Sequence, residues 1–177
     1  PTVRGMAAEG NVYTGFLYAG LMIDKAGKPK VIEFNCRFGD PETQPIMCRL
    51  ESSLVLLVEA ALAKALDKVE ATWDPRPTVG VVIAAGGYPA DYAKGDVIEG
   101  LDAAAQLEGK VFHAGTALKD GQIVTAGGRV LCATAIGRTV EEAQQQAYRL
   151  AEKIRWNGSF YRNDIGYRAI ARERGEK

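Results

Sequence analysis

Five polar side chains capable of chemistry lie close together near the start of the sequence, namely Glu33, Asn35, Arg37, Asp40 and Glu42. Residues 31–35 are rich in β-branched and aromatic types, which predicts a strand. Successive side chains of a strand point to opposite faces, so Glu33 and Asn35 share one face. A carboxylate and an amide oxygen side by side on a rigid strand suit a hard cation such as Mg²⁺.

A Glu-x-Asn pair alone has a simpler interpretation, because such a pair also occurs on the solvent-exposed face of any half-buried sheet. The residues that follow it favour a functional site. Gly39 and Pro41 end the strand, and Asp40 and Glu42 flank the proline in a polar turn. These two carboxylates either bind substrate groups or cap the turn and the helix after it.

The run from Arg37 to Ile46, Arg-Phe-Gly-Asp-Pro-Glu-Thr-Gln-Pro-Ile, resembles the signature of the phosphoribosylamine–glycine ligase (glycinamide ribonucleotide synthetase) family. That family belongs to the ATP-grasp superfamily. The similarity extends along essentially the whole chain, including Gly86-Gly87-Tyr88-Pro89, Phe112-His113-Ala114-Gly115-Thr116 and Asp164-Ile165-Gly166. The resemblance implies that Glu33 and Asn35 bind the Mg²⁺, or alternatively Mn²⁺, that bridges the phosphates of ATP.

The family reaction joins glycine to 5-phosphoribosylamine through a glycyl phosphate, with ATP cleaved to ADP and phosphate, in de novo purine biosynthesis. The resemblance implies that Arg37 is catalytic and stabilises the transferring phosphoryl group or the acyl phosphate. It also implies substrate contacts from Gly39, Asp40, Glu42 and His113. Asp40 and Glu42, being anionic, suit amine or ammonium groups, whereas His113 is alternatively a structural hydrogen-bonding residue.

Two other interpretations of the chain stay open. One is another ATP-grasp ligase or carboxylase, and the other is a non-catalytic C-terminal module that closes a cleft or binds a partner. The chain begins without a methionine, and the resemblance implies that an N-terminal part of the same enzyme precedes it. That part would hold most of the ATP-binding clamp, so the isolated chain is expected to be inactive.

The composition is ordinary for a globular protein, with 177 residues, 47% hydrophobic and 25% charged. Basic and acidic residues number 22 each, so no net charge attracts nucleic acid or a membrane surface. No run of 18 apolar residues predicts a transmembrane helix. Three widely spaced cysteines and a single histidine argue against a zinc site or disulfide framework and favour a reducing cytoplasm.

The predicted fold class is α+β, in two parts. Residues 1–70 form the end of an ATP-grasp domain, with a strand at 12–23, a turn at 24–29, a returning strand at 30–35 and one helix from about 46 to 66. Residues 71–78, which contain Trp73, Pro75 and Pro77, are predicted to be a linker.

Residues 79–177 are predicted to form a small antiparallel sheet backed by helices. Strands are expected at 79–85, 96–101, 111–118, 122–125 and 129–136, with a short helical turn at 102–107. Asp120-Gly121 and Gly127-Gly128 are typical hairpin turns. Thr139 and Glu142 form a capping box that opens a helix to about Ile154, and a short helix follows at 166–173. Arg129 either meets a phosphate or is solvated.

Overall fold

The computed structural model describes residues 1–176 and divides the chain into two compact units. The first comprises Pro1–Asp40 and Leu50–Trp73, and the second comprises Pro41–Arg49 and the chain from Asp74 onward. The chain therefore passes between the units after residues 40, 49 and 73. The domain limits predicted from the sequence, 1–70, 71–78 and 79–177, stay a prediction, and each unit is described below by itself.

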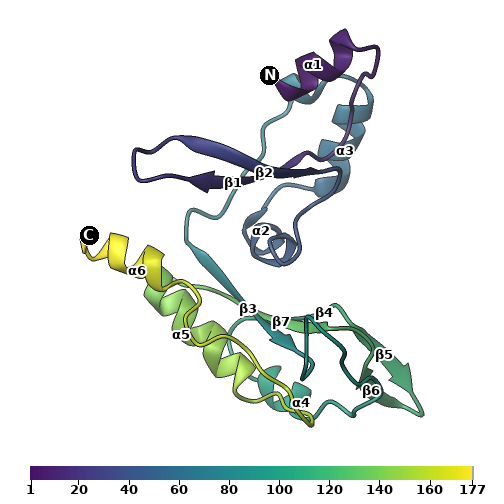
Figure 1. The fold of residues 1–177 in the computed structure, drawn as a ribbon, viewed down its shortest axis with the longest axis vertical. Helices are drawn as coiled ribbons and strands as arrows, with labels where there is room; N and C mark the ends of the chain where they lie inside the picture. The colour runs from purple at the N-terminus through teal and green to yellow at the C-terminus, as the bar shows by residue number, and fades with distance from the viewer. Residues whose placement is uncertain (177) are drawn as a thin grey trace. The chain divides into compact units, whose positions relative to one another are not determined.

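The first unit contains a two-stranded antiparallel hairpin and three short helical segments (Figure 1). Its elements are α1 (Thr2–Ala8), β1 (Tyr18–Ile23), β2 (Pro29–Asn35), α3 (Leu54–Leu62) and the 3₁₀ helix η1 (Leu66–Lys68). The hairpin is confirmed, and its turn is built on Asp24, whose Oδ1 accepts from the N–H groups of Ala26 and Lys28 at 2.9 Å each. The first strand is shorter than predicted, and α1 was not predicted.

The single helix predicted from about 46 to 66 is wrong. The structure has α2 (Thr43–Arg49), a break, and then α3. At the break Leu50 forms a β-bridge with Trp73, and Ser52 Oγ accepts from the N–H of Thr72 at 2.7 Å. The hydroxyl of Ser53 then caps α3 by accepting from the Leu56 N–H. Paired serines compete with the helix for backbone hydrogen bonds, which overrides the apolar periodicity of the segment.

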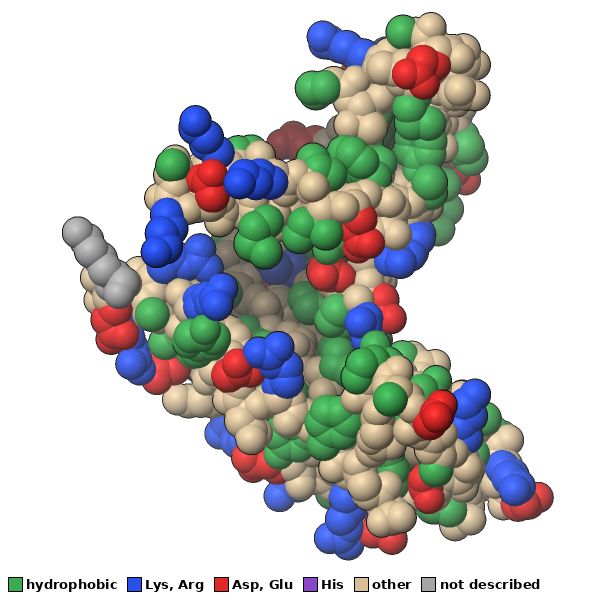
Figure 2. Space-filling view, in the orientation of Figure 1, with side chains coloured by type: hydrophobic (Ala, Val, Ile, Leu, Met, Phe, Trp, Pro, Cys, Tyr) green, Lys and Arg blue, Asp and Glu red, His purple; other side chains and the backbone are tan. Residues whose placement is uncertain are grey.

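The hairpin and α3 leave much of their apolar surface uncovered within the chain. Figure 2 shows hydrophobic side chains gathered over both elements. On the hairpin the exposed residues are Leu21, Met22, Ile23, Val31, Ile32 and Phe34, and on α3 they are Val55, Leu56 and Leu62.

The second unit is an α+β arrangement, which confirms the predicted fold class (Figure 1). Its three-stranded antiparallel sheet has the order β3-β7-β4, and β5 pairs with β6 in a separate hairpin. The elements are α2, β3 (Thr78–Ala84), α4 (Leu101–Ala104), β4 (Lys110–His113), β5 (Thr116–Lys119), β6 (Gln122–Thr125), β7 (Arg129–Ile136), α5 (Val140–Ala151) and α6 (Tyr167–Glu173).

The core of this unit surrounds β7, the central strand. Residues 130–135 of β7 are buried on both faces, whereas β3 buries only alternate side chains, Val79, Val81 and Ile83, before Ala84. Helix α5 packs against β3 and β7 and contributes Ala143, Ala147, Leu150 and Ala151 to the same core. Helix α2 also packs against these two strands. A strand covered on both faces is nearly continuously apolar, as β7 is.

Three predicted strand features of this unit are wrong. The segment expected as a strand at 96–101 forms only isolated β-bridges, from Val97 to Val124 and from Glu99 to Arg155. The strand expected at 111–118 is divided into β4 and β5, which belong to different sheets. Gly127-Gly128 does not close a hairpin, because β6 pairs with β5 and β7 pairs with β3 and β4. Instead the segment crosses residue 115, whose carbonyl accepts from the N–H of Ala126 at 2.7 Å. The Asp120-Gly121 turn is confirmed, and both of its residues have positive φ, as its hairpin type requires.

Helix α5 begins at the predicted cap, since Thr139 Oγ1 accepts from the Glu142 N–H at 3.1 Å. The Glu142 carboxylate accepts from the Arg138 N–H at 2.7 Å, one residue earlier than in a capping box. A second carboxylate, that of Glu173 on α6, accepts from the Val140 N–H at 2.9 Å. In the described part of the chain, no helix has the length and apolar character needed to cross a bilayer.

Candidate active site

Glu33 and Asn35 lie at the end of β2, opposite Gly20 and Tyr18 of β1. The pairing register shifts between Gly20 and Leu21, so the strand carries a β-bulge just before Glu33. Both residues follow the bulge, and their spacing of two keeps them on one face. A Cβ at residue 20 would lie 3.1 Å from Cγ of Glu33, so the glycine leaves room for the carboxylate side chain.

The two side chains fit a metal–phosphate group. Glu33 is exposed and Asn35 is half-buried, and the amide nitrogen Nδ2 of Asn35 is buried without a hydrogen-bond partner. A buried donor without an acceptor is costly, so this nitrogen calls for an acceptor such as a phosphate oxygen. Among residues 1–176 no three His, Cys, Asp or Glu side chains cluster as metal ligands. A hard cation here would complete its shell with phosphate and water oxygens.

Arg37, Gly39 and Asp40 follow Asn35 on a loop of the same unit. The Nη1 of Arg37 donates to the carbonyl of Phe38 at 2.9 Å. The Phe38 ring packs against that of Phe16, with 4.3 Å between centroids, and Gly39 is buried. Asp40 is exposed and is the last residue of this segment of the first unit. The aromatic pair therefore anchors the loop that presents the guanidinium and the carboxylate.

Glu42 and His113 belong to the second unit. The carbonyl of Glu42 accepts from the Ile46 N–H at 3.2 Å, which places Glu42 at the N-terminal boundary of α2. His113 is the last residue of β4 and is exposed, and its Nδ1 lies 3.0 Å from Oγ1 of Thr116. This hydrogen bond is the one that a structural histidine would make. The substrate roles of both residues stay predictions.

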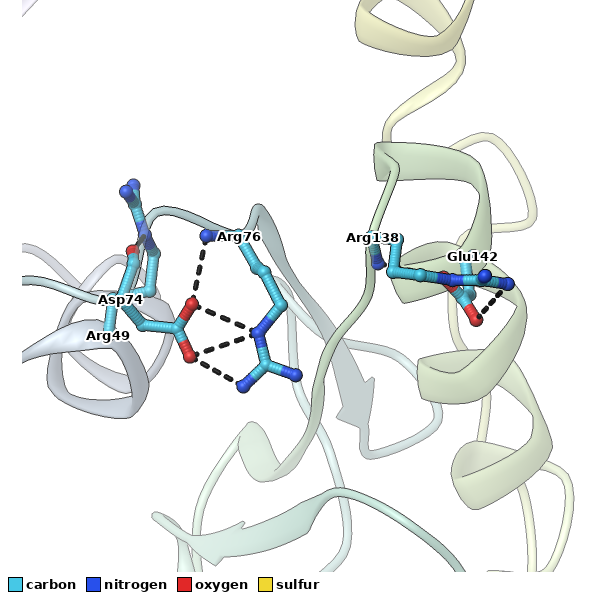
Figure 3. A network of polar contacts seen from close by, with 5 residues as sticks. All are labelled: Arg49, Asp74, Arg76, Arg138 and Glu142. Atoms are coloured by element: carbon cyan, nitrogen blue, oxygen red, sulfur yellow. Dashed lines mark hydrogen bonds and ion pairs between the residues drawn. The ribbon is translucent and has the colours of Figure 1, made fainter.

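Asp74 anchors the far end of α2, the helix that follows Glu42 (Figure 3). Its carbonyl accepts from Nε of Arg49 at 2.9 Å, and its N–H donates to the Arg49 carbonyl at 2.8 Å. Its buried carboxylate binds the Arg76 guanidinium, with 2.6 Å between Oδ2 and Nη2. The hydrogen bonds from Arg76 lower the pKa of Asp74 to about 2.

Sequence reasoning missed the bulge and this ion pair. The bulge depends on which residues of two strands face each other, and a single sequence does not give that register. The ion pair had a local signal, because Asp74-Pro75-Arg76 places opposite charges on either side of a proline within the expected linker. The first unit thus carries the oxygens of Glu33 and Asn35 on a strand, and the second carries α2, whose last residue is held by Asp74.

Comparison with family models identifies two matches. The model described as "Phosphoribosylglycinamide synthetase, C domain" matches residues 78–168. The model described as "Phosphoribosylglycinamide synthetase, ATP-grasp (A) domain" matches residues 1–43. The second match includes Glu33 and Asn35, and the first includes His113 and Arg129.

Comparison with curated protein sequences identifies the same family. The chain is 89% identical over 176 residues to the phosphoribosylamine–glycine ligase of Pseudomonas aeruginosa, covering 99% of this chain and 41% of that protein. It thus spans about two fifths of the length of the curated relatives it matches.

Solved structures agree with the sequence matches. The phosphoribosylamine–glycine ligase of Thermotoga maritima is 42% identical, with a TM-score of 0.75, over 91% of this chain and 39% of that one. The N5-carboxyaminoimidazole ribonucleotide synthetase of the same organism has a TM-score of 0.56 over 86% of this chain and 39% of that one. At 17% identity the latter likeness concerns the fold alone.

Proposed function

Because the chain belongs to the phosphoribosylglycinamide synthetase family, we propose that its full-length protein joins glycine to 5-phosphoribosylamine in an ATP-dependent reaction. The products are glycinamide ribonucleotide, ADP and phosphate, as in de novo purine biosynthesis. The chain supplies the metal-binding end of the active site and the C-terminal domain. The observation that carries this proposal is that Glu33 and Asn35 share one face of β2, in a chain that matches two models of this family, over residues 1–43 and 78–168.

The chemistry proceeds in two balanced steps. A carboxylate is a poor electrophile, so a glycine carboxylate oxygen first attacks the γ-phosphorus of ATP, and ADP leaves. The amine of phosphoribosylamine then attacks the acyl carbon of glycyl phosphate, and inorganic phosphate leaves as the amine loses a proton. Phosphoryl transfer depends on positioning and charge neutralisation more than on covalent help from the protein.

Glu33 and Asn35 would hold Mg²⁺, or Mn²⁺ in its place, and the cation would supply positive charge against the phosphates of ATP. The Nδ2 of Asn35 would donate to a phosphate oxygen, which supplies the acceptor that this buried nitrogen lacks among the described residues. Arg37 would place its guanidinium beside the transferring phosphoryl group, held on its loop by the hydrogen bond to Phe38.

The loop after β2 would orient the amines. Asp40 and Glu42 follow β2 in the sequence, and the charge of their carboxylates favours the ammonium of glycine or the amine of phosphoribosylamine over phosphate. Gly39, which is buried, would let the backbone approach a substrate, and exposed His113 would contact a substrate group. The three cysteines are reduced thiols, which suits a cytoplasmic enzyme.

The test uses the full-length protein that contains this chain. Release of ADP is expected only when glycine and phosphoribosylamine are both present, with one ADP formed per glycinamide ribonucleotide. The fold-level likeness to a carboxyaminoimidazole synthetase gives the competing arm, in which bicarbonate and aminoimidazole ribonucleotide replace the two substrates. Turnover in that arm alone, or no ligase activity in either, would overturn the proposal.

A further inference from the structure

We propose that the Asn157-Gly158 dipeptide is a site of spontaneous covalent modification, at which asparagine converts to isoaspartate through a succinimide. The chain contains four asparagines, and the residues that follow them are Val12, Cys36, Gly158 and Asp164. Asn157 is therefore the one that precedes a glycine. Because glycine has no side chain, its backbone nitrogen is the least hindered nucleophile that can follow an asparagine. The inference does not depend on the proposed function.

Both reacting groups are accessible at the surface of the second unit. Asn157 and Gly158 are exposed. Within residues 1–176, neither the side-chain amide of Asn157 nor the backbone N–H of Gly158 makes a hydrogen bond. A hydrogen bond to either group would have to break before the two could react, so this dipeptide starts without that barrier.

The reaction balances with water as the other reactant. The Gly158 nitrogen gives its proton to hydroxide and attacks Cγ of Asn157, which forms a new N–C bond. The bond from Cγ to the amide nitrogen breaks, and ammonia leaves with a proton from water, so that a succinimide ring remains. Water then breaks one of the two C–N bonds of the ring. Opening at the main-chain carbonyl gives isoaspartate, and opening at Cγ gives aspartate.

The turn around the dipeptide restrains the closure of this ring. The Ser159 N–H donates to the Trp156 carbonyl at 3.1 Å, and the Trp156 N–H donates to Oγ of Ser159 at 3.2 Å. Gly158 has a φ of 74°, which a glycine adopts readily in such a turn. Ring closure requires rotation about the bond between Cα and the carbonyl carbon of Asn157, which moves a peptide group inside the turn. Removal of the Ser159 hydroxyl should therefore speed the reaction.

Isoaspartate does not fit this turn as asparagine does. The turn lies between buried Trp156 and Phe160, which exchanges backbone hydrogen bonds of 2.8 and 3.1 Å with Ala84 at the end of β3. A Cβ on Gly86 would lie 2.8 Å from the Gly158 carbonyl oxygen, so the two backbones already touch. Isoaspartate adds one carbon to the main chain between these fixed points, whereas aspartate adds none. The isoaspartate form should consequently be less stable.

Incubation of the full-length protein in mildly alkaline buffer, followed by peptide mass spectrometry, tests the proposal. Isoaspartate should accumulate at residue 157 at least about tenfold faster than at residue 163, where an exposed asparagine precedes an aspartate. Asn157→Gln is the matched control and should form almost no product, because its longer side chain must close a larger ring. Ser159→Ala should form the product faster than wild type, and an unchanged rate in that variant would contradict the role of the turn.

Melting temperatures of the separated products test the structural consequence. The isoaspartate form should melt below the unmodified protein, whereas Asn157→Asp, with the same new charge and an unaltered main chain, should melt close to it. Equal melting temperatures for the isoaspartate form and the unmodified protein would refute that consequence.

The site itself would be refuted in two ways. One is a folded protein that forms no isoaspartate at residue 157 while the urea-unfolded protein does, and the other is equal rates at residues 157 and 163. None of these measurements uses ligase activity, so a failure of the proposed function leaves them unchanged.

Discussion

At the scale of single residues, Glu33 and Asn35 owe their shared position to strand alternation and to a bulge that precedes both. We predict that Glu33→Gln and Asn35→Ala each lower kcat of the full-length enzyme by about 100-fold or more, because each removes a hard ligand for the cation. Steady-state rates at limiting Mg²⁺ measure the effect. Glu152→Gln, an exposed change after α5, is the control and should leave kcat unchanged. Near-normal rates in both site variants would contradict the assignment.

Asp40 separates a substrate role from a capping role. If its carboxylate binds a substrate amine, Asp40→Asn should raise the KM for glycine or phosphoribosylamine by about tenfold and leave that for ATP nearly unchanged. If it only caps the turn, the melting temperature should fall while every KM stays intact. Loss of Mg-ATP affinity alone would instead assign Asp40 to the metal site.

The sequence predicts some features of this site and not others. The shared face of Glu33 and Asn35 follows from alternation, which needs no knowledge of the partner strand. The unpaired Nδ2 of Asn35 and the room beside Gly20 depend on atoms brought close by folding. The positions of functional side chains are thus predictable where a single strand carries them. The contacts that those side chains make with other segments are not.

At the scale of elements, β7 is the strand on which the second unit depends. Leu131 of β7 is fully buried, whereas Leu118 of β5 is 72% exposed. We predict that Leu131→Ala lowers the free energy of unfolding by about 2–5 kcal/mol, through lost burial and the cavity left behind. Leu118→Ala, the same chemical change on the surface, should stay within about 0.5 kcal/mol. Urea denaturation of both variants tests this, and equal losses would contradict the described core.

The Asp74–Arg76 pair should make the attachment of α2 sensitive to acid. Its folded pKa of about 2 lies below the ordinary value of 3.8, so the charged carboxylate stabilises the fold above pH 3.8. That stabilisation is lost as the pH falls from 3.8 towards 2. We predict that Asp74→Asn lowers the melting temperature by several degrees at pH 7, and that the difference from wild type shrinks across this window.

Asp164→Asn is the matched control for the Asp74 experiment. Arg162 also lowers the pKa of Asp164, through side-chain hydrogen bonds, but that ion pair is largely exposed. Exposed pairs contribute little because water and salt screen them, so the melting temperature should change much less. A difference between Asp74→Asn and wild type that is constant from pH 7 to about 2 would show that the carboxylate charge does not anchor α2.

The helix between 46 and 66 shows why elements are harder to predict than single positions. Its apolar period is genuine, yet Ser52 and Ser53 redirect the backbone towards Thr72 and Leu56. The interruption needs Trp73 and Thr72 beside the break, about twenty residues along the chain. The hairpin turn predicted at Gly127-Gly128 is wrong for a similar reason. This segment donates hydrogen bonds to the distant carbonyl of residue 115, so its conformation is not that of a local turn. The Asp120-Gly121 turn is local, and it was predicted correctly.

At the scale of the whole molecule, the proposed function implies that other residues of the full-length protein contribute to the ATP site. The ATP-grasp match covers residues 1–43, and the chain is about two fifths as long as its curated relatives. We predict that the isolated 177-residue chain binds Mg-ATP at least about 100-fold more weakly than the full-length protein, because on the proposed function these residues supply only part of the contacts to ATP. Isothermal calorimetry of both proteins measures the ratio. Micromolar affinity in the isolated chain would mean that the site is misplaced.

The chain passes between its two units three times, and this limits how it can be divided into separate modules. Any single division of the chain leaves at least one unit incomplete, because residues 41–49 are separated in sequence from the rest of their unit. A truncation that starts at Asp74 would remove α2 and uncover the face of β3 and β7 on which it packs. Excision of an intact second unit therefore requires residues 41–49 to be joined directly to residue 74, which is an internal deletion of residues 50–73 and not a simple truncation.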